Sequence, residues 1–242
     1  MARGLVRAHA HRAPRLYNLR NDYLAIPQHL RRRVHDADYE VLASLDAQRP
    51  LVLDVGANVG QSIVSIKAVL PNARIVAFEP IPRAARRAQA IAARYADVEV
   101  RAMACGRLPD RQLTLYVPQA RGVVFSQLAS AVRPDPHEVY LHADHGGFTW
   151  VREQDVRIEE LIVPSVALAQ LGLQPDAIKL DVEGLELEVL QGAGAMVEGV
   201  RRPRILIVER GGGDEVCRHL GARGYELASS NAVNAVYRRS AA

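Results

Sequence analysis

Acidic side chains crowd a short stretch whose pattern changes from that of a strand to that of a helix. The segment KLDVEGLELEVL contains Lys179, one of only two lysines in the chain, followed by Asp181, Glu183, Glu186 and Glu188. Residues two apart on a strand project to the same side, so Lys179 can form an ion pair with Asp181. Such a pair keeps the carboxylate charged, and a charged carboxylate can act as a general base or orient a hydroxyl.

The later acids of this stretch have structural explanations. Glu183 precedes Gly184 at the expected start of a helix, where a carboxylate interacts with the helix dipole by about 0.3–1 kcal/mol. Capping and chemistry therefore both remain open for Glu183. Glu186 and Glu188 are expected to lie on a solvated helix face.

A glycine loop and a distant glutamate suggest a cofactor site. In LDVGANVGQ, Asp54 ends an apolar run, and Gly56 and Gly60 allow the backbone to pass close to a ligand before the next helix. Glu79 ends the next apolar run, 19 residues after Gly60, where an acid can accept both hydroxyls of a ribose. The alternatives are tight helix–strand packing for the glycines and a surface position for Glu79. The combination predicts an adenosine-containing cofactor at the carboxyl ends of parallel strands.

The charges of the loop discriminate between two such cofactors. The run from Gly56 to Gly60 lacks the middle glycine of the G-x-G-x-x-G dinucleotide pattern. Asp54 is awkward beside a pyrophosphate but suits an amino-acid ammonium. S-adenosylmethionine carries an ammonium and a sulfonium and no phosphate, so the charge balance favours it over NAD.

Apolar runs and helical spacing alternate along much of the chain. Strands are expected at 50–56, 74–80 and 98–104, separated by helices at 61–70 and 83–95. This rhythm predicts right-handed crossovers and a parallel sheet. It breaks in an insertion that contains the strand-like RQLTLYV and FTWVREQDVRIEELIV and the loop-like RPDPHEVYLHADHGG.

The alternation resumes after the insertion and ends in a different pattern. A strand at 177–181, a helix from Gly184 and a strand at 204–209 follow the insertion. At the other end, a short amphipathic helix is expected at 36–47, before the first strand. The chain closes with YELASSNAVNAVYRR, two short strands around a polar turn. An antiparallel hairpin is therefore expected on an otherwise parallel sheet.

Several of these segments together resemble the FkbM family of S-adenosylmethionine-dependent methyltransferases. They are LDVGANVGQ, FEPIP, ACG, IKLDVEGLELEVLQGA and PRILIVE, and the resemblance covers roughly residues 36–240. It implies an α/β class I methyltransferase (Rossmann-like) fold, with a mixed seven-stranded sheet, helices on both faces and a C-terminal antiparallel hairpin. It also implies methyl transfer to a hydroxyl of a sugar, glycolipid or natural-product acceptor.

The resemblance assigns site residues position by position. Asp181 would face the transferred methyl group, with Lys179 and Glu183 beside it as the remaining catalytic candidates. The cofactor-binding candidates are Asp54, Gly56, Asn58, Gly60, Gln61, Glu79, Pro80 and Cys105. The chain departs from the family pattern at 167–169, Ala-Leu-Ala in place of Thr-Leu-Asp, and at 126–127, Ser-Gln in place of paired serines. Both departures lie in the insertion at 105–176, which is expected to bind the acceptor.

Three acids and a histidine-containing loop raise the question of a metal. Asp181, Glu183 and Glu209 could together hold a hard divalent cation, but this is not favoured and no metal ligand is assigned. His142 and His145 are expected at the surface of a glycine-rich loop. In that loop, Phe148 and Trp150 either cover the acceptor or pack into the core.

Composition bounds the class of protein. Of the 242 residues 49% are hydrophobic, and the formal net charge is +4. Residues 1–33 hold eight arginines and one acid, which predicts a basic arm at 1–35 and a methyltransferase domain at 36–242. The arm either makes weak contacts with anionic membrane surfaces or is a solvated segment of biased composition.

Other features concern location and partners. Cys105 and Cys217 lie far apart, and the chain shows neither a run of about 18 apolar residues nor a secretory signal. A cytoplasmic protein with free thiols is expected. With one Trp and three Phe, surfaces for stacking on nucleic-acid bases look thin, so a small-molecule or glycoside acceptor is favoured over nucleic acid. The oligomeric state stays open.

The leading hypothesis is an S-adenosylmethionine-dependent O-methyltransferase. Its first alternative is an NAD-dependent oxidoreductase, which shares the glycine loop and the acid after the second strand. The second is a catalytically inactive, cofactor-binding adaptor that keeps the fold. RNA methylation is a lesser option, suggested by charge alone.

Overall fold

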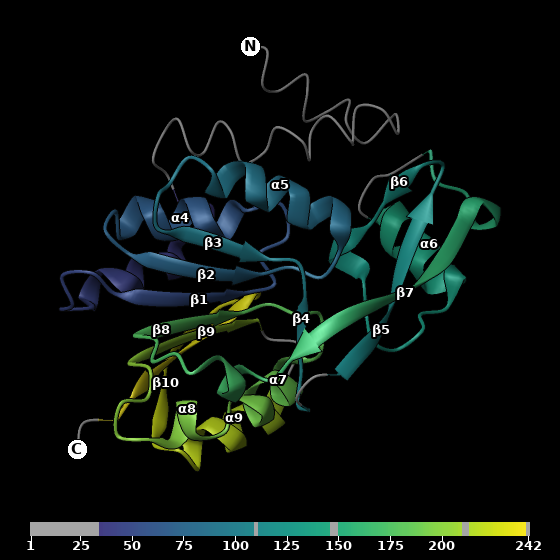
Figure 1. Ribbon diagram of the computed structural model, residues 1–242. Helices are drawn as coiled ribbons and strands as arrows, with labels where there is room; N and C mark the ends of the chain where they lie inside the picture. The colour runs from purple at the N-terminus through teal and green to yellow at the C-terminus, as the bar shows by residue number, and fades with distance from the viewer. Residues whose placement is uncertain (1–33, 109–110, 146–149, 210–212, 241–242) are drawn as a thin grey trace.

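A mixed seven-stranded sheet forms the centre of the molecule (Figure 1). The structure is a computed structural model that describes residues 34–108, 111–145, 150–209 and 213–240. The strand order is β10-β11-β9-β8-β1-β2-β3. The strands are β1 (Leu51–Val55), β2 (Arg74–Phe78), β3 (Val98–Arg101), β8 (Ala177–Leu180), β9 (Ile205–Glu209), β10 (Tyr225–Ser230) and β11 (Asn234–Arg239).

The central strands are parallel and buried on both faces. β1 lies between β2 and β8, with Leu53 opposite Val76 on one side and Ile178 on the other. All four residues of β8 are buried, which explains why these strands are continuous apolar runs and do not alternate. The parallel alternation expected from the sequence is confirmed.

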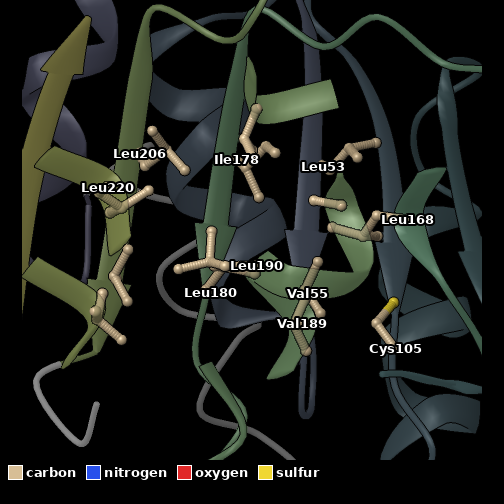
Figure 2. Close-up of a cluster of buried hydrophobic side chains, with 14 of the residues drawn as sticks. Leu53, Val55, Cys105, Leu168, Ile178, Leu180, Val189, Leu190, Leu206 and Leu220 are labelled. Atoms are coloured by element: carbon tan, nitrogen blue, oxygen red, sulfur yellow. The ribbon is translucent and has the colours of Figure 1, made fainter. Parts of the chain in front are cut away.

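Helices cover both faces of this sheet (Figure 1). One face carries α4 and α5, and the other carries α7, α8 and α9. Figure 2 shows the core on the second face, where Leu190 packs near Ile178 and Leu180. The helices are α4 (Gln61–Val69), α5 (Pro82–Ala92), α7 (Glu186–Ala193), α8 (Ala195–Glu198) and α9 (Gly213–Gly221), and a 3-10 helix, η1 (Ala37–Ser44), precedes β1.

The C-terminal hairpin has the expected place. β11 pairs antiparallel with both β10 and β9, so it inserts between them and makes the sheet mixed. The 3-10 helix η1 lies where an amphipathic helix was expected, and Asp36 caps it by accepting a hydrogen bond from the Asp38 amide at 3.1 Å.

The insertion forms a second sheet of four strands in the order β4-β7-β5-β6. Its main part is a long antiparallel ribbon of β5 and β7, which extends from one end of the main sheet (Figure 1). The strands are β4 (Ala104–Cys105), β5 (Arg111–Ala120), β6 (Val123–Val124) and β7 (Val156–Val166). Between β6 and β7 lie α6 (Pro136–His145) and the 3-10 helices η2 (Ser126–Leu128) and η3 (Glu153–Asp155), and the 3-10 helix η4 (Leu168–Leu171) follows β7.

The prediction of a loop at 133–147, between β6 and β7, is wrong, because α6 occupies most of that segment. Asp135 accepts a hydrogen bond from the His137 amide at 2.9 Å at the start of this helix. Val139 and Ala143 lie four residues apart and are buried in a separate hydrophobic cluster. The sequence does not predict this helix, because prolines at 134 and 136 and glycines at 146–147 lie so close to its short apolar face.

The predicted arm at 1–35 lies almost wholly outside the described residues. Among the helices that the structure describes, none is both long enough and apolar enough to cross a bilayer.

Candidate active site

A cavity of about 200 Å³ opens where β1, β2, β8 and β9 end. The main sheet supplies one wall and the second sheet supplies the other. The lining residues are Val55, Gly56, Asn58, Phe78, Glu79, Pro80, Ile81, Met103, Ala104, Cys105, Leu113, Leu115, Ser126, Gln127, Ala129, Asp181, Val182, Glu183, Leu185 and Glu209.

The two glycines of the first loop have different roles. Gly56 lines the cavity at φ +84°, and a Cβ there would lie 1.7 Å from the carbonyl oxygen of Asp181. Only glycine lets the two loops approach so closely. Gly60 does not line the cavity, and a Cβ on it would lie 3.3 Å from the Ala88 Cα in α5. Gly60 therefore packs against α5, which is a helix–helix contact and differs from the helix–strand packing that is its alternative from sequence.

Glu79 is a buried part of the cavity wall. Its side chain accepts a hydrogen bond from the Asn58 amide at 2.8 Å and another from the Ile81 amide at 2.8 Å. Burial raises the pKa of Glu79 to about 7, against the lowering effect of these two bonds. The surface alternative for Glu79 is wrong, because the residue is only 5% exposed.

Lys179 connects the glycine loop, which contains Gly56, with the acidic loop, which contains Asp181 and Glu183. Its Nζ donates to the Gly56 carbonyl at 2.5 Å, lies 3.1 Å from Asp181 Oδ2 and lies 3.5 Å from Asp54 Oδ1. Burial lowers the pKa of Lys179, but Asp181 and Asp54 raise it by more, so it lies above its ordinary value. The predicted ion pair between Lys179 and Asp181 is confirmed.

Asp54 is fully buried and does not line the cavity. Its Oδ2 accepts a hydrogen bond from Ser62 Oγ at 2.5 Å, while Oδ1 has no hydrogen-bond donor among the described residues. Among the described residues, the positive charge of Lys179 therefore compensates the burial of Oδ1 without a hydrogen-bond donor. Gln61 also stays outside the lining, whereas Asn58, Pro80 and Cys105 belong to it. Burial raises the pKa of the Cys105 thiol above its ordinary value.

Three carboxylates meet at the floor of the cavity. Ligand oxygens of Asp181, Glu183 and Glu209 all lie within 4.8 Å of one another. Burial raises the pKa of Glu183 to about 8, with further contributions from Glu209 and Asp181. Burial also raises the pKa of Glu209 to about 7, helped by the charge of Asp181 and a hydrogen bond with it. Near neutral pH this cluster therefore holds protons as well as negative charge.

Glu186 stabilises the acidic loop by accepting hydrogen bonds from its backbone amides. It is fully buried, and its Oε1 accepts hydrogen bonds from the Val182 amide at 3.1 Å and the Gly184 amide at 3.2 Å. The prediction of a solvated position is therefore wrong for Glu186, because the loop folds back over α7 and its amides need an acceptor. The same prediction is confirmed for Glu188, which is exposed.

The second sheet completes the cavity without adding charge. Leu113, Leu115 and Gln127 line it, and Ser126 Oγ donates to Asn58 Oδ1 at 3.1 Å, which joins the insertion to the glycine loop. Apart from the departure at 126–127, the sequence does not identify these lining residues, since their position depends on how the insertion folds over the main sheet.

The aromatic and histidine residues of the insertion lie elsewhere. Trp150 is buried in a core cluster, its ring centroid 6.3 Å from that of Phe125, so core packing holds for Trp150. His142 is exposed, as expected. The side chain of His145 and all of Phe148 lie outside the described residues.

The lining charges suit a cation. The cavity wall carries Glu79, Asp181, Glu183 and Glu209, and none of the described residues that line it is an arginine or a lysine. A pyrophosphate would meet acids with no basic partner at such a wall, whereas a sulfonium would meet complementary charge.

The seven-stranded sheet, its terminal hairpin and the cavity at the strand ends define a class I methyltransferase fold. Residues 54–227 match the family model described as Methyltransferase FkbM domain. The chain belongs to this family and is an S-adenosylmethionine-dependent methyltransferase.

Individual relatives are more distant. The AMB antimetabolite synthetase AmbE of Pseudomonas aeruginosa is 31% identical over 163 residues, which cover 59% of this chain and 8% of that protein. The chain thus spans a small part of that protein's length.

Two solved structures of methyltransferases have a similar course of the chain. The precorrin-6y C5,15-methyltransferase from Geobacter metallireducens is 14% identical at a TM-score of 0.44, and covers 85% of this chain and 87% of its own. The ribosomal protein L11 methylase from Lactobacillus delbrueckii subsp. bulgaricus is 10% identical at a TM-score of 0.45, with coverages of 84% and 78%.

Proposed function

We propose that this methyltransferase transfers the methyl group to a hydroxyl of a small-molecule acceptor, such as a sugar, a glycolipid or a natural product. The observation that carries this proposal is the cluster of Asp181, Glu183 and Glu209 on one side of a cavity whose other side is uncharged. A hydroxyl is a poor nucleophile until a base holds or removes its proton, and the cluster provides such bases.

The residues present fit S-adenosylmethionine. Gly56 lines the cavity where its loop packs against the Asp181 backbone, and Glu79 lies at the end of β2, where it can accept hydrogen bonds from ribose hydroxyls. When bound, the cofactor supplies a methyl group on a cationic sulfur. Asn58, Pro80 and Cys105 would contribute to the rest of its binding surface. Asp54 would act through the glycine loop and Lys179, since it is buried behind the lining residues.

The acidic cluster would orient the acceptor and take its proton. Lys179 holds Asp181 at 3.1 Å, so this carboxylate is fixed to accept a hydrogen bond from the acceptor hydroxyl. A carboxylate of the cluster would take the hydroxyl proton when the methyl carbon is transferred to the oxygen, and the cofactor sulfur would keep the electron pair of the broken sulfur–methyl bond. Glu209, with a pKa of about 7, is partly ionised near neutral pH and is suited to receive this proton, whereas Glu183, with a pKa of about 8, mostly holds a proton there already.

The insertion at 105–176 would select the acceptor. Leu113 and Leu115 offer an apolar surface, and Ser126 and Gln127 offer neutral hydrogen-bonding groups. Such a wall fits an acceptor with both apolar and hydroxylated parts. The domain at 36–242 would then divide into a cofactor-binding sheet and an acceptor-binding insertion.

Calorimetric titration with S-adenosylmethionine, its demethylated product and NAD tests the cofactor. Binding of the first two without NAD supports the proposal, and binding of NAD alone would restore the oxidoreductase alternative. A panel of hydroxylated glycosides and natural products, with detection of the methylated product, then tests the reaction.

Asp181→Asn tests the acceptor side. We expect methyl transfer to fall by a factor of about 10²–10⁴, while affinity for the cofactor stays within about threefold. Glu188→Gln, at an exposed position of the following helix, is the matched control and should keep full activity. Full turnover in Asp181→Asn would remove Asp181 from the reaction. Tight cofactor binding with no transfer to any acceptor by the native chain would favour the inactive adaptor.

A further inference from the structure

A second, larger cavity lies at the opposite end of the main sheet from the active site. It has a volume of about 600 Å³ and opens beside the first residue of β9, whereas the active site lies at the last residue of that strand. We call it the arginine groove. Its lining residues are Ser44, Leu45, Val200, Arg202, Arg204, Ile205, Arg238, Arg239 and Ser240.

The arginine groove is strongly basic. Four arginines line it, and none of the described residues in its lining is acidic. Asp46, just outside, forms an exposed ion pair with Arg204 at 2.7 Å, and Glu226 lies opposite Arg238 in the pairing of β10 with β11. For Arg202 and Arg239, the described part of the chain shows no carboxylate within ion-pair distance.

Arg202 is held in place by its neighbours. Its guanidinium lies over the ring of Tyr225, 5.8 Å from the centroid, and the Tyr225 hydroxyl donates to the Pro203 carbonyl at 3.0 Å. Gly224 leaves room for it, because a Cβ there would lie 2.8 Å from Arg202 Nη2. The Nε of Arg202 is buried and has no acceptor among the described residues. A fixed guanidinium with an unused donor indicates a missing acceptor.

Arg239 is fixed in a similar way. Its Nη1 donates to the Val200 carbonyl at 3.2 Å and lies 3.5 Å from the Arg202 carbonyl. These bonds hold the Arg239 guanidinium against the backbone of Val200 and Arg202 without neutralising its charge. Arginines whose charges lie unpaired in one cavity favour an anion that they can share.

We propose that the arginine groove binds phosphate groups, carried either by a small phosphorylated molecule or by the headgroup of an anionic lipid. Guanidinium forks match the oxygens of a phosphate in pairs, which makes arginine suited to this anion. β9 separates the two sites by four residue steps, about 13 Å at ~3.3 Å per step. The bound phosphate therefore anchors a ligand or a surface away from the reacting hydroxyl. The exposed Val200 at the rim, 91% accessible, adds an apolar contact beside the charges.

The two sources of phosphate are separated by two binding measurements on the full chain at fixed ionic strength. One is calorimetry with pyrophosphate, and the other is sedimentation with phosphatidylcholine vesicles that contain or lack phosphatidic acid. The groove variants are Arg202→Gln/Arg239→Gln and Arg204→Gln/Arg238→Gln. The second pair is more exposed, so it tests the proposal even if the first pair weakens the fold.

The control is Arg86→Gln/Arg94→Gln, which removes the same charge at exposed positions far from the groove. All proteins keep residues 1–33, so binding by the basic arm is common to them. We expect both groove variants to lose about tenfold or more in affinity, while the control binds like the native chain.

The pattern of binding assigns the source. Pyrophosphate binding without vesicle binding assigns a soluble phosphorylated ligand, and vesicle binding that needs phosphatidic acid assigns a lipid headgroup. Equal binding by the groove variants and the control, or no binding to either probe, would overturn the proposal. Calorimetry with S-adenosylmethionine on each variant reports the distant active site, so failure of the proposed reaction is seen separately.

Discussion

The two walls of the active-site cavity differ in charge. The wall from the main sheet carries all four lining carboxylates, Glu79, Asp181, Glu183 and Glu209, while the wall from the insertion carries none. The charged wall lies at the strand ends of the main sheet, and the neutral wall belongs to the second sheet. The difference indicates that cofactor binding and chemistry belong to the first wall and the choice of acceptor to the second.

The charged wall also has the tighter backbone. Gly56 is in contact with the loop of Asp181, and Lys179 joins both to Asp54. A connection to the neutral wall is the bond from Ser126 to Asn58. Changes to Gly56 or Lys179 should therefore affect folding and cofactor binding together, whereas changes in the neutral wall should affect the acceptor alone.

The largest effect is expected from Gly56→Ala. The new Cβ would lie 1.7 Å from the Asp181 carbonyl oxygen, so one of the two loops must move. We expect destabilisation of more than about 4 kcal/mol, or loss of cofactor binding if the loops separate. Thermal unfolding and calorimetry measure the two outcomes.

Gly122→Ala is the matched control for this substitution. Gly122 has φ +78°, close to that of Gly56, but a Cβ on it would meet nothing within 4 Å. It should cost only about 1–2 kcal/mol, the strain of a left-handed backbone. Equal effects at both glycines would show that the approach of the two loops is unimportant.

Lys179→Met should have the next largest effect. It removes the cation shared by the fully buried Asp54 and the partly exposed Asp181, and loss of one partner of a buried pair costs about 3–5 kcal/mol in comparable cases. Lys67→Met is the control, because Lys67 is similarly buried and pairs with Asp97 at 2.5 Å outside the cavity lining. Both variants should unfold at lower temperature, but only Lys179→Met should lose cofactor affinity. Unchanged cofactor affinity in Lys179→Met would separate the lysine from the site.

The charged wall was accessible from sequence because strand ends carry a recognisable pattern. Apolar runs that end in an acid or in glycine predicted the positions of Gly56, Glu79 and Asp181 at one edge of the sheet, and all three line the cavity. Which side chains face the cavity was harder to predict. Asp54 ends its strand in the same way, yet its carboxylate is buried against Ser62.

The neutral wall was not accessible in this way. Its position depends on contacts between β5 and β7, whose paired residues lie up to 54 positions apart, as for Arg111 and Ser165. Glu209 was considered only as a metal ligand, since its place next to Asp181 follows from the order of β8 and β9 in the sheet. The sequence shows that both are acids at strand ends and does not show that they share a hydrogen bond.

The pH dependence of stability should report the protons of the charged wall. The pKa of Glu209 rises from 4.5 to about 7 on folding, so the folded chain binds this proton more tightly than the unfolded chain. This contribution to stability is complete below about pH 4.5 and is lost as the pH rises through about 7. Glu209→Gln should therefore flatten the fall in stability between these values, as measured by thermal unfolding. Glu188→Gln should leave it unchanged, and an equally steep fall in both variants would place the proton elsewhere.

Ser126→Ala should have a smaller effect, confined to the neutral wall. It removes the hydrogen bond to Asn58, worth about 1 kcal/mol, and loosens the insertion against the glycine loop. We expect the KM for the acceptor to rise about fivefold, with cofactor affinity changed by less than about twofold. Ser130→Ala, four residues further along the chain and outside the cavity lining, should change neither constant. A loss of cofactor affinity in Ser126→Ala would mean that the two walls do not divide the work as proposed.

The smallest effect is expected from metal removal. Lys179 already places a positive charge 3.1 Å from Asp181, and the raised pKa values of Glu183 and Glu209 mean that these acids hold protons near neutral pH. A divalent cation would have to displace those protons and share Asp181 with a fixed ammonium, which weakens its binding. We therefore expect treatment with EDTA to change the rate of methyl transfer by less than about twofold. Loss of activity that magnesium restores would contradict this, and would mean that the charged wall uses a metal ion where the lysine and the shared protons are proposed to suffice.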